Sequence, residues 1–521
     1  MAELTTWSAA ATGGGLLLAS LLLRYLWTPH PLSKQLRGPK ASSILLGNLL
    51  DTFGSVVAWK TAGNYPEPFL SWVKTYGGAV HYRELTAHVV LVTDPKALQY
   101  IFATNGANYP RDPTMNSLFA DMLFGVGLLS ADGAQHDQYR KLLNPLFTTT
   151  SVKSFVEIFA SHAQTFCDTV LATAGPTSLN LLAEFHKMTL GTIGLSAFGF
   201  DFDACPEAVA AYDQCNVELS TAMFIGMYMI PGFLFWPLPE LRRRLAGQRA
   251  LKKIMMDVIA HKSTLGPRSV CENTPPDLLD LILPHATTQE ALIHTMTFIS
   301  AGHETTSSAL CWIFAALIAH PTSVTRIRDE VQSIVTTHGS IANGVADLKY
   351  TLAVIQESMR LDATVDTLVY RVATLDDSIP MSDGSTVLIP AGTSINICPA
   401  AMSRNPKYWA HVNEFDPNRF LEGTPAFEAD LALRHGKPHA FFYLPFSAGS
   451  KNCIGQRFAL TQMQVVVATL VSQFDFELAS DADLRHKHNG VTVHPARLQV
   501  VVRQHLGPHV VTTDIGTAFI G

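Results

Sequence analysis

Apolar residues recur at three- and four-residue spacing through long stretches of the chain after residue 95. This spacing places them on one face of a helix, so it predicts a mainly helical body. Two β-rich runs, 80–85 and 89–92, predict a hairpin, and a third over 491–502, interrupted by Pro495, predicts a small sheet near the C-terminus. The pattern shows no internal repeat. The fold class is therefore mainly α with small β-sheets (α+β).

An uncharged stretch, Leu4–Leu23, lies near the N-terminus. Its length is close to the roughly 20 residues that cross a bilayer, although Ser, Thr and Gly dilute its first part. A cleaved signal peptide is the alternative, but it requires a basic segment ahead of the apolar run, where Glu3 is the only charge. We predict an uncleaved N-terminal transmembrane anchor over residues 1–27.

The charges that follow this stretch are all basic until Asp51, namely Arg24, Lys34, Arg37 and Lys40. The positive-inside rule then places the following chain in the cytosol. The prolines at 29 and 31 predict a stiff Pro-rich hinge over residues 28–42. No later stretch has the composition of a linker, so residues 43–505 form one domain, followed by a C-terminal tail over 506–521.

A second apolar segment, Met223–Leu238, is uncharged and rich in aromatic residues, but prolines interrupt it. It is too short and too broken to span a membrane. Three arginines follow at Arg242-Arg243-Arg244. An aromatic stretch beside a basic cluster suits a membrane interface, and a buried core segment fits the same residues equally well.

Composition narrows the class of protein. The 521 residues carry 37 basic and 43 acidic side chains, a net charge of −6, which excludes nucleic-acid binding through a globally basic surface. Only 15% of residues are charged, against about 25% in ordinary globular proteins. The mean hydropathy of +0.17 leans apolar, so the chain has much surface to bury, a membrane to contact, or both.

Seven cysteines without a Cys-x-x-Cys pair exclude a disulfide scaffold and a structural zinc site of thiolates. The segment His303–Ser307 begins like the zinc-protease motif, but Ser307 replaces its second histidine. The chain contains no Gly-x-Gly-x-x-Gly motif and no phosphate-binding loop. It therefore has no evident nucleotide site of its own.

One cysteine stands in unusual surroundings. Gly449 and Gly455 bracket Cys453, and a helical pattern begins at Arg457. A tight turn would deliver the thiol to a helix N-terminus, where free N–H groups and the helix dipole stabilise a thiolate. Glycines remove side chains where a large flat partner must approach the backbone. A thiolate ligand to haem iron fits this pattern.

The segment resembles the cytochrome P450 signature Phe-x-x-Gly-x-basic-x-Cys-x-Gly, carried here by Phe446, Gly449, Lys451, Cys453 and Gly455. The resemblance implies the haem-thiolate fold and haem b as cofactor, with Cys453 as the axial ligand of the iron and the other four residues around the haem. The family usually has arginine where this chain has Lys451. A lysine still pairs with a haem propionate, but as a point charge, without the two parallel hydrogen bonds that a guanidinium donates.

The string Ala301–Thr306 lies inside a helical pattern over 292–318. An acid, an alcohol and a glycine coincide there, which permits a local opening of the helix that holds dioxygen and water. A threonine in a helix also commonly bonds back to a carbonyl one turn earlier. The string resembles the oxygen-activating helix of the family, which implies Thr305 as the proton-relay alcohol and Glu304 as the acid.

Glu357-Ser358-Met359-Arg360 matches the Glu-x-x-Arg motif of the family, and Phe415–Phe420 matches its partner segment. In isolation such a pair is most often a solvated contact. The resemblance implies a buried network of Glu357, Arg360 and Arg419 that fixes the loop carrying Cys453, a structural role. The family commonly has proline shortly after this arginine, and its absence here weakens any transfer of a substrate.

Three further residues match propionate-binding positions. His136 and Arg140 resemble the Trp-x-x-x-Arg helix of the family with histidine for tryptophan, and Arg371 resembles another propionate-binding arginine. An ordinary surface helix also explains His136 and Arg140. The resemblance covers nearly the whole chain after the anchor.

The resemblance implies a monooxygenase that inserts one oxygen atom from O2 into a lipophilic substrate such as a fatty acid, sterol or terpenoid-like molecule. Electrons would come from NADPH through a separate NADPH-cytochrome P450 reductase, with cytochrome b5 as a second donor. The basic residues expected near this partner are Arg140, Lys141, Lys451 and Arg457. The implied location is the endoplasmic reticulum membrane, single-pass, with the catalytic domain cytosolic.

Two alternatives stay open. One is a haem-thiolate isomerase or dehydratase that acts on peroxides without dioxygen. The other is a non-catalytic haem carrier or sensor. The pair Glu304-Thr305 argues against both, because neither needs protons delivered to dioxygen.

Overall fold

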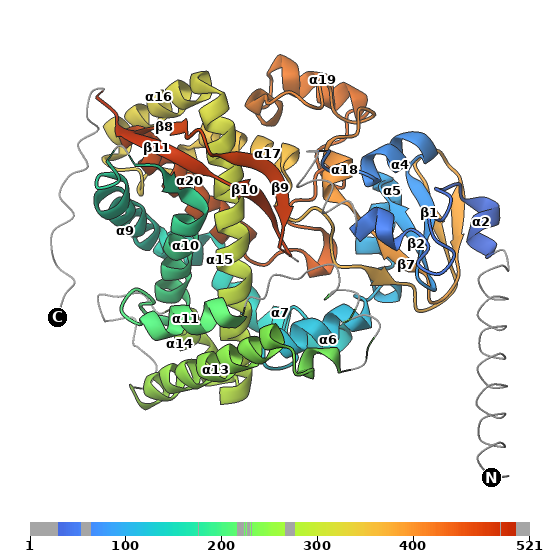
Figure 1. The fold of residues 1–521 in the computed structure, drawn as a ribbon. Coiled ribbons are helices and arrows are strands. Elements are labelled where there is room, and N and C mark those ends of the chain that lie inside the picture. The colour runs from blue at the N-terminus through green and yellow to red at the C-terminus, as the bar shows by residue number, and fades with distance from the viewer. Residues whose placement is uncertain are drawn as a thin grey trace, which may run out of the picture.

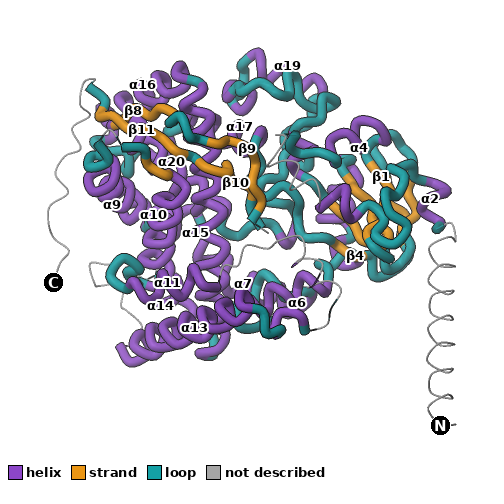
Figure 2. Tube along the Cα trace, viewed as in Figure 1, coloured by secondary structure: helices purple, strands orange, loops and turns teal. Residues whose placement is uncertain are grey.

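The computed structural model describes residues 30–53, 64–175, 177–215, 232–265, 277–489 and 491–506, together with residues 223, 226 and 230. Helices make up most of this part of the chain, and short strands gather in two regions, one around β1 and the other around β8 to β11 (Figures 1 and 2). This arrangement confirms the predicted mainly helical fold with small sheets. The predicted anchor over 1–27 and residues 507–521 of the predicted tail lie outside the described residues.

The helices of the described part pack around three hydrophobic clusters, and the third of these includes Leu32 and Leu98. They are α2 (Pro31–Gln35), α4 (Phe69–Tyr76), α5 (Pro95–Gln99), α6 (Pro113–Met122), α7 (Gly133–Leu143), α8 (Thr149–Ser154), α9 (Val156–Phe166), α10 (Leu181–Phe198), α11 (Pro206–Cys215), α13 (Pro239–Leu265), α14 (Leu278–Ile282), α15 (Thr288–Ala319), α16 (Pro321–His338), α17 (Lys349–Leu361), α18 (Pro399–Ser403), α19 (Pro425–Leu433) and α20 (Gln456–Gln473).

The predicted hairpin forms β1 (Ala79–Glu84) and β2 (Ala87–Val92), which pair antiparallel. Strand β7 (Ser394–Asn396) joins β2 in parallel and β4 (Arg371–Val372) joins β7, so the sheet order is β1-β2-β7-β4. The smaller sheets are β5 (Asp377–Pro380) with β6 (Thr386–Ile389), β9 (Asp483–His488) with β10 (Val493–Arg497), and β3 (Leu179–Asn180) with β11 (Gln499–Gln504) and β8 (Phe474–Leu478). The predicted C-terminal run thus forms two strands, and the register of β10 shifts after Pro495, which has no N–H to donate.

Helix α15 runs through the helical body and contacts α10, α17, α20 and β10 (Figure 1). It begins with a capping box, because Thr287 and Glu290 satisfy each other's backbone N–H groups. Most of its later side chains are buried apolar residues, so the long apolar run reflects burial on several sides. The helix therefore presents a fixed wall to the centre of the molecule.

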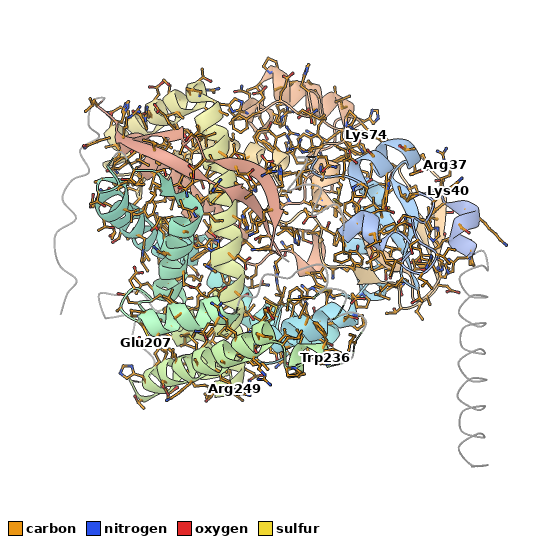
Figure 3. All side chains as sticks on the ribbon, in the orientation of Figure 1. Arg37, Lys40, Lys74, Glu207, Trp236 and Arg249 are labelled. Atoms are coloured by element: carbon orange, nitrogen blue, oxygen red, sulfur yellow. The ribbon has the colours of Figure 1, made fainter. Side chains whose placement is uncertain are left out.

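The described part of the predicted hinge, residues 30–42, is mostly exposed but contacts the domain at several points. Pro31 begins helix α2, whose Leu32 is fully buried, and the side chain of Gln35 accepts a hydrogen bond from the N–H of Leu388. Arg37 and Lys40 lie at the outer edge of the β1 region (Figure 3). From residue 30 onward the segment is therefore held against the domain by these contacts.

Among the described residues, no single helix is both long and apolar enough to span a bilayer. Helices α15 and α16 meet that criterion only together, and they bend by 108° at their junction. In the described part of the predicted interfacial segment, Phe235 and Trp236 are exposed whereas Phe233 is buried. Arg244 of the basic cluster is buried against Asp121, so that arginine serves the core and not a membrane surface.

Candidate active site

A cavity of about 1060 Å³ lies between the N-terminal hairpin, α7, α15 and the segment 445–463. Its walls are mainly apolar, with Phe298, Leu128 and Val369 among them. Every residue that the sequence analysis assigned to the cofactor lines this cavity except Gly449. The tertiary structure therefore brings together side chains from positions 136 to 455.

Cys453 faces this cavity from the turn before α20. Its N–H donates to the carbonyl of Phe446 at 2.8 Å, which closes the loop between them. Helix α20 begins at Gln456 with Gly455 as N-cap, one residue before the predicted start at Arg457. Although Cys453 lies deep in the molecule, its side chain is exposed because it opens onto the cavity.

The two glycines of the loop have different reasons to be glycine. Gly449 has φ +73°, and a Cβ there would collide with the carbonyl oxygen of Phe102. Its role is therefore close packing against a neighbouring backbone, which corrects the expectation that it clears space for a ligand. Gly455 lines the cavity, and a Cβ there would lie 4.0 Å from the sulfur of Cys453.

Positive charge gathers beside the Cys453 loop. Arg140 on α7 donates to the carbonyl and side-chain oxygens of Asn452 at 2.7 and 2.5 Å. Arg371 on β4 is buried over the ring of Phe102, and Arg111 forms a backbone bridge with it. Burial lowers the pKa of Arg371 to about 9 and that of Arg111 to about 10, and repulsion by a neighbouring arginine adds to each shift.

Two other predicted residues complete this cluster. Lys451 forms an ion pair with Asp132, and burial, together with Arg111, lowers its pKa to about 8. His136 is buried, and its Nε2 lacks a hydrogen-bond partner among the described residues. Its other ring nitrogen contacts Asp137 at 3.3 Å. The surface-helix alternative is therefore wrong for His136, because its ring faces inward.

On α15, Thr305 lines the cavity and donates to the carbonyl of Ala301 at 2.7 Å. The helix is continuous through this turn, so the expected local opening is absent from the described helix. Glu304 points away, towards Asn489 and Thr492 at the β9–β10 turn, and it accepts hydrogen bonds from both side chains. Burial raises the pKa of Glu304 above its ordinary value.

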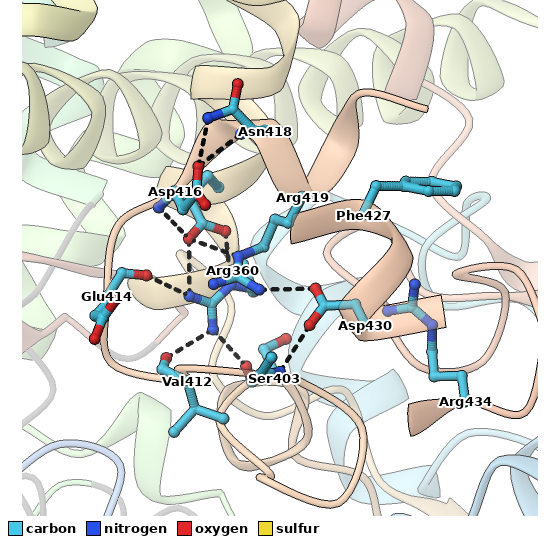
Figure 4. A network of polar contacts seen from close by, with 12 residues as sticks. Arg360, Ser403, Val412, Glu414, Asp416, Asn418, Arg419, Phe427, Asp430 and Arg434 are labelled. Atoms are coloured by element: carbon cyan, nitrogen blue, oxygen red, sulfur yellow. Dashed lines mark hydrogen bonds and ion pairs between the residues drawn. The ribbon is translucent and has the colours of Figure 1, made fainter. Parts of the chain in front are cut away.

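Glu357, Arg360 and Arg419 form a buried charge network (Figure 4). Arg360 Nε lies 2.6 Å from one oxygen of Glu357, and Arg419 Nε lies 3.0 Å from the other. Asp430 on α19, which the sequence analysis missed, pairs with Arg419 at 2.7 Å. The network contacts the segment before Cys453 through α17, because Tyr443 donates to the carbonyl of Gln356 at 2.8 Å.

Comparison with known proteins bears directly on this geometry. A sequence model described as cytochrome P450 matches residues 45–502. The chain belongs to the cytochrome P450 family. "Cytochrome P450 monooxygenase 205" of Postia placenta is 29% identical over 86% of each chain. "Taurochenodeoxycholic 6 alpha-hydroxylase" of Sus scrofa is 29% identical over 76% of this chain and 78% of its own. "Cytochrome P450 4X1" of Homo sapiens is 26% identical over 79% of each.

Members of the cytochrome P450 family are enzymes that use haem with an axial cysteine thiolate. The cavity fits that group in three respects. It offers one thiol, a large apolar volume, and buried cations with which the two haem propionates would pair. The orphaned Nε2 of His136 would donate to a carboxylate when the ring carries a proton on that nitrogen.

The electrostatics of Cys453 differ from the sequence prediction. Burial raises the pKa of its thiol, while the Gly455 N–H and Arg140 oppose that shift without overcoming it. The helix N-terminus alone therefore does not hold a thiolate in this cytochrome P450. A bound metal cation would supply the missing stabilisation, because a coordinating thiol is deprotonated outright.

Three polar residues of this cytochrome P450 site escaped the sequence analysis. Arg111 follows Tyr109-Pro110, a turn signal that could have marked it, and its side chain donates to the carbonyls of Leu128 and Ala131. Asp132 and Asp430 carry no local signal, because each meets its partner only through tertiary contact.

Proposed function

We propose that this chain is a membrane-anchored haem-thiolate monooxygenase that inserts one oxygen atom from O2 into a lipophilic substrate. Electrons come from NADPH through a separate reductase, and the domain lies on the cytosolic side of the endoplasmic reticulum membrane. The observation that carries the proposal is Cys453, which faces a large apolar cavity also lined by Thr305 and by buried cations. The name of the Sus scrofa relative, "Taurochenodeoxycholic 6 alpha-hydroxylase", supports a hydroxylation as the reaction.

In this proposal Cys453 would bind the haem iron through its thiolate, and Arg371, Arg140, Lys451 and His136 would hold the propionates. When bound, the haem would supply the activation of dioxygen, and a cysteine thiolate ligand would promote that chemistry. Phe446 anchors the loop through its carbonyl, and Gly455 leaves room beside the sulfur. The Glu357 network holds α17 against the segment that leads to Cys453.

Thr305 and Glu304 would handle protons. The hydroxyl of Thr305 faces the cavity and can turn from the Ala301 carbonyl towards a ligand. The raised pKa of Glu304 favours the protonated carboxyl. The residue could therefore store a proton on the side of α15 that faces the β9–β10 turn. Because its carboxyl points to the β9–β10 turn, it reaches the cavity only after its side chain rotates.

The reductase would approach the Cys453 side. Lys141 and Arg457 are exposed there, whereas Arg140 and Lys451 are engaged by Asn452 and Asp132. We therefore assign the contact with an acidic partner surface chiefly to the first two residues.

The test compares the reconstituted wild type with Thr305→Ala in the presence of reductase and a panel of fatty acids, sterols and terpenoids. The wild type should consume NADPH and O2 in proportion to the amount of product that it forms. Thr305→Ala should bind haem normally but release most reducing equivalents as hydrogen peroxide, because the relay hydroxyl is gone. NADPH, O2, product and peroxide are measured together.

Each alternative has its own outcome in that experiment. Turnover of peroxide substrates without reductase or O2 would identify an isomerase or dehydratase. Haem binding without any turnover would identify a carrier or sensor. If Thr305→Ala couples NADPH consumption to product formation as the wild type does, Thr305 is not the proton relay. The monooxygenase assignment would still hold.

One buried carboxyl in the cavity wall predicts a pH dependence of substrate binding. Glu84 at the end of β1 accepts a hydrogen bond from Thr52 at 2.8 Å, and burial raises its pKa to about 7. Below that pH the group is neutral and compatible with a neutral lipophilic substrate, whereas above it an ionised carboxylate would lose water when the substrate enters.

Binding spectra of a neutral ligand should therefore weaken as pH rises through 7, by about tenfold at one pH unit above the pKa if only the neutral form binds. Glu84→Gln should make the affinity independent of pH over this range. Glu422→Gln, at an exposed site, is the matched control. An unchanged pH profile in Glu84→Gln would assign the titration to another group.

A further inference from the structure

Three histidines meet at the outer face of the N-terminal sheet, apart from the cavity. His81 lies on β1 and His88 on β2, and their Nε2 and Nδ1 atoms are 3.0 Å apart. The ring of His30 stacks on that of His88, with centroids 3.7 Å apart. One ring nitrogen of each residue lies within 4.8 Å of one nitrogen of each of the others.

The fold places these rings together by long-range contacts. His81 on β1 lies opposite Val90 on β2, and His88 lies two residues before Val90, opposite Arg83. The two histidine rings are therefore diagonal neighbours on one face of the hairpin. His30 precedes α2 and is held there because Leu32 is fully buried. The N–H of His81 also donates to the carbonyl of Arg37 at 3.2 Å, which ties the same segment to β1.

The spacing of the nitrogens suits a tetrahedral metal ion. Zinc binds imidazole nitrogen at about 2.0–2.1 Å, which separates two ligand atoms by roughly 3.3 Å. The contact between His81 and His88 is close to that value. His30 would have to swing out of its stack on His88, and the contact that holds its ring, a 3.3 Å hydrogen bond from the Leu32 N–H, is long for such a bond.

We propose that His30, His81 and His88 form a binding site for a divalent transition-metal ion of the zinc type, with water in the fourth position. Three imidazoles are a ligand set that zinc accepts, and no carboxylate or thiol is needed. The ion would cross-link the segment that enters the domain to the β1–β2 hairpin. The turn of that hairpin, residues 85–86, lines the cavity, so the ion would hold this part of the wall in place.

The test uses the full-length holoenzyme, treated with chelator, loaded with ZnCl2 at pH 7.5 and passed through a desalting column. Elemental analysis should find one zinc per haem iron, and zinc-edge X-ray absorption should show three nitrogen ligands near 2.0 Å. His81→Gln and His88→Gln should each weaken zinc binding by at least about tenfold. His261→Gln, at an exposed position on α13, should bind zinc like the wild type.

The ferrous–CO spectrum of each variant checks that the haem domain is folded. If a variant does not fold, zinc protection of His81 and His88 from diethyl pyrocarbonate in the wild type, read by peptide mass spectrometry, replaces it. Absence of stoichiometric zinc in the wild type, or equal zinc retention in the His→Gln variants, would overturn the site and leave a stack of imidazoles. None of these readouts depends on monooxygenase activity.

Discussion

Cys453→Ala is expected to abolish the thiolate-type ferrous–CO absorption band and all monooxygenase turnover. The reason is geometric, because Cys453 is the one cysteine among the described residues that lines the cavity. Without its sulfur the iron would have no axial thiolate, and the electron donation that favours O–O cleavage would be lost. The measurement is the difference spectrum of the dithionite-reduced protein with and without CO.

Cys398→Ala is the matched control for this substitution. Its thiol is fully buried away from the cavity, so the change should cost packing but leave the thiolate band in place. Retention of the band in Cys453→Ala would refute the ligand assignment. Loss of the thiolate band in both variants would point to a folding defect. Haem content and circular dichroism would then show whether the variants are folded.

Arg360→Ala is expected to destabilise the protein by about 3–5 kcal/mol, a large part of the free energy of unfolding of a typical protein. The guanidinium donates to both oxygens of Glu357 and to the carbonyls of Ser403, Val412 and Glu414. Its removal would leave several acceptors buried without donors, and water has little access because Arg360 is fully buried. The measurement is the urea midpoint of unfolding, followed by circular dichroism.

Arg503→Ala provides the comparison for this network. Arg503 pairs with Glu477 at 2.6 Å, but both side chains are more than half exposed, so the loss should stay below about 1 kcal/mol. Similar unfolding midpoints for Arg360→Ala and Arg503→Ala would show that the buried network does not stabilise the fold. Loss of haem without loss of stability in Arg360→Ala would instead favour a direct role in positioning the Cys453 loop.

The Cys453 loop illustrates what can be predicted locally. The start of α20 and the cavity-facing thiol follow from residues within one short segment, because glycine and helix-capping preferences act over a few positions. The conformation of Gly449 was predictable as a turn, but its partner was not. Phe102 lies more than 300 positions earlier and meets Gly449 only in the folded chain.

Glu304 shows the same limit for a side chain. Its place on a long buried helix follows from apolar spacing and from the capping box at Thr287. Its direction depends on Asn489 and Thr492, which no pattern in the sequence connects to it. The expected local opening of the helix does not occur for a related reason. The hydroxyl of Thr305 donates to the carbonyl of Ala301 within an intact helix, so no opening is needed to pair it.

The sequence by itself determined the helical body, the hairpin, the family and the identity of the cysteine that faces the cavity. These features depend on periodicity and on motifs within short stretches, where backbone propensity and side-chain spacing decide the outcome. Only the tertiary structure decided that Arg111 forms a backbone bridge with Arg371 and that Asp132 forms an ion pair with Lys451. It also decided that three histidines lie close together outside the cavity. Those arrangements depend on burial and on charges brought together from distant positions, and such interactions exist only once the chain has folded.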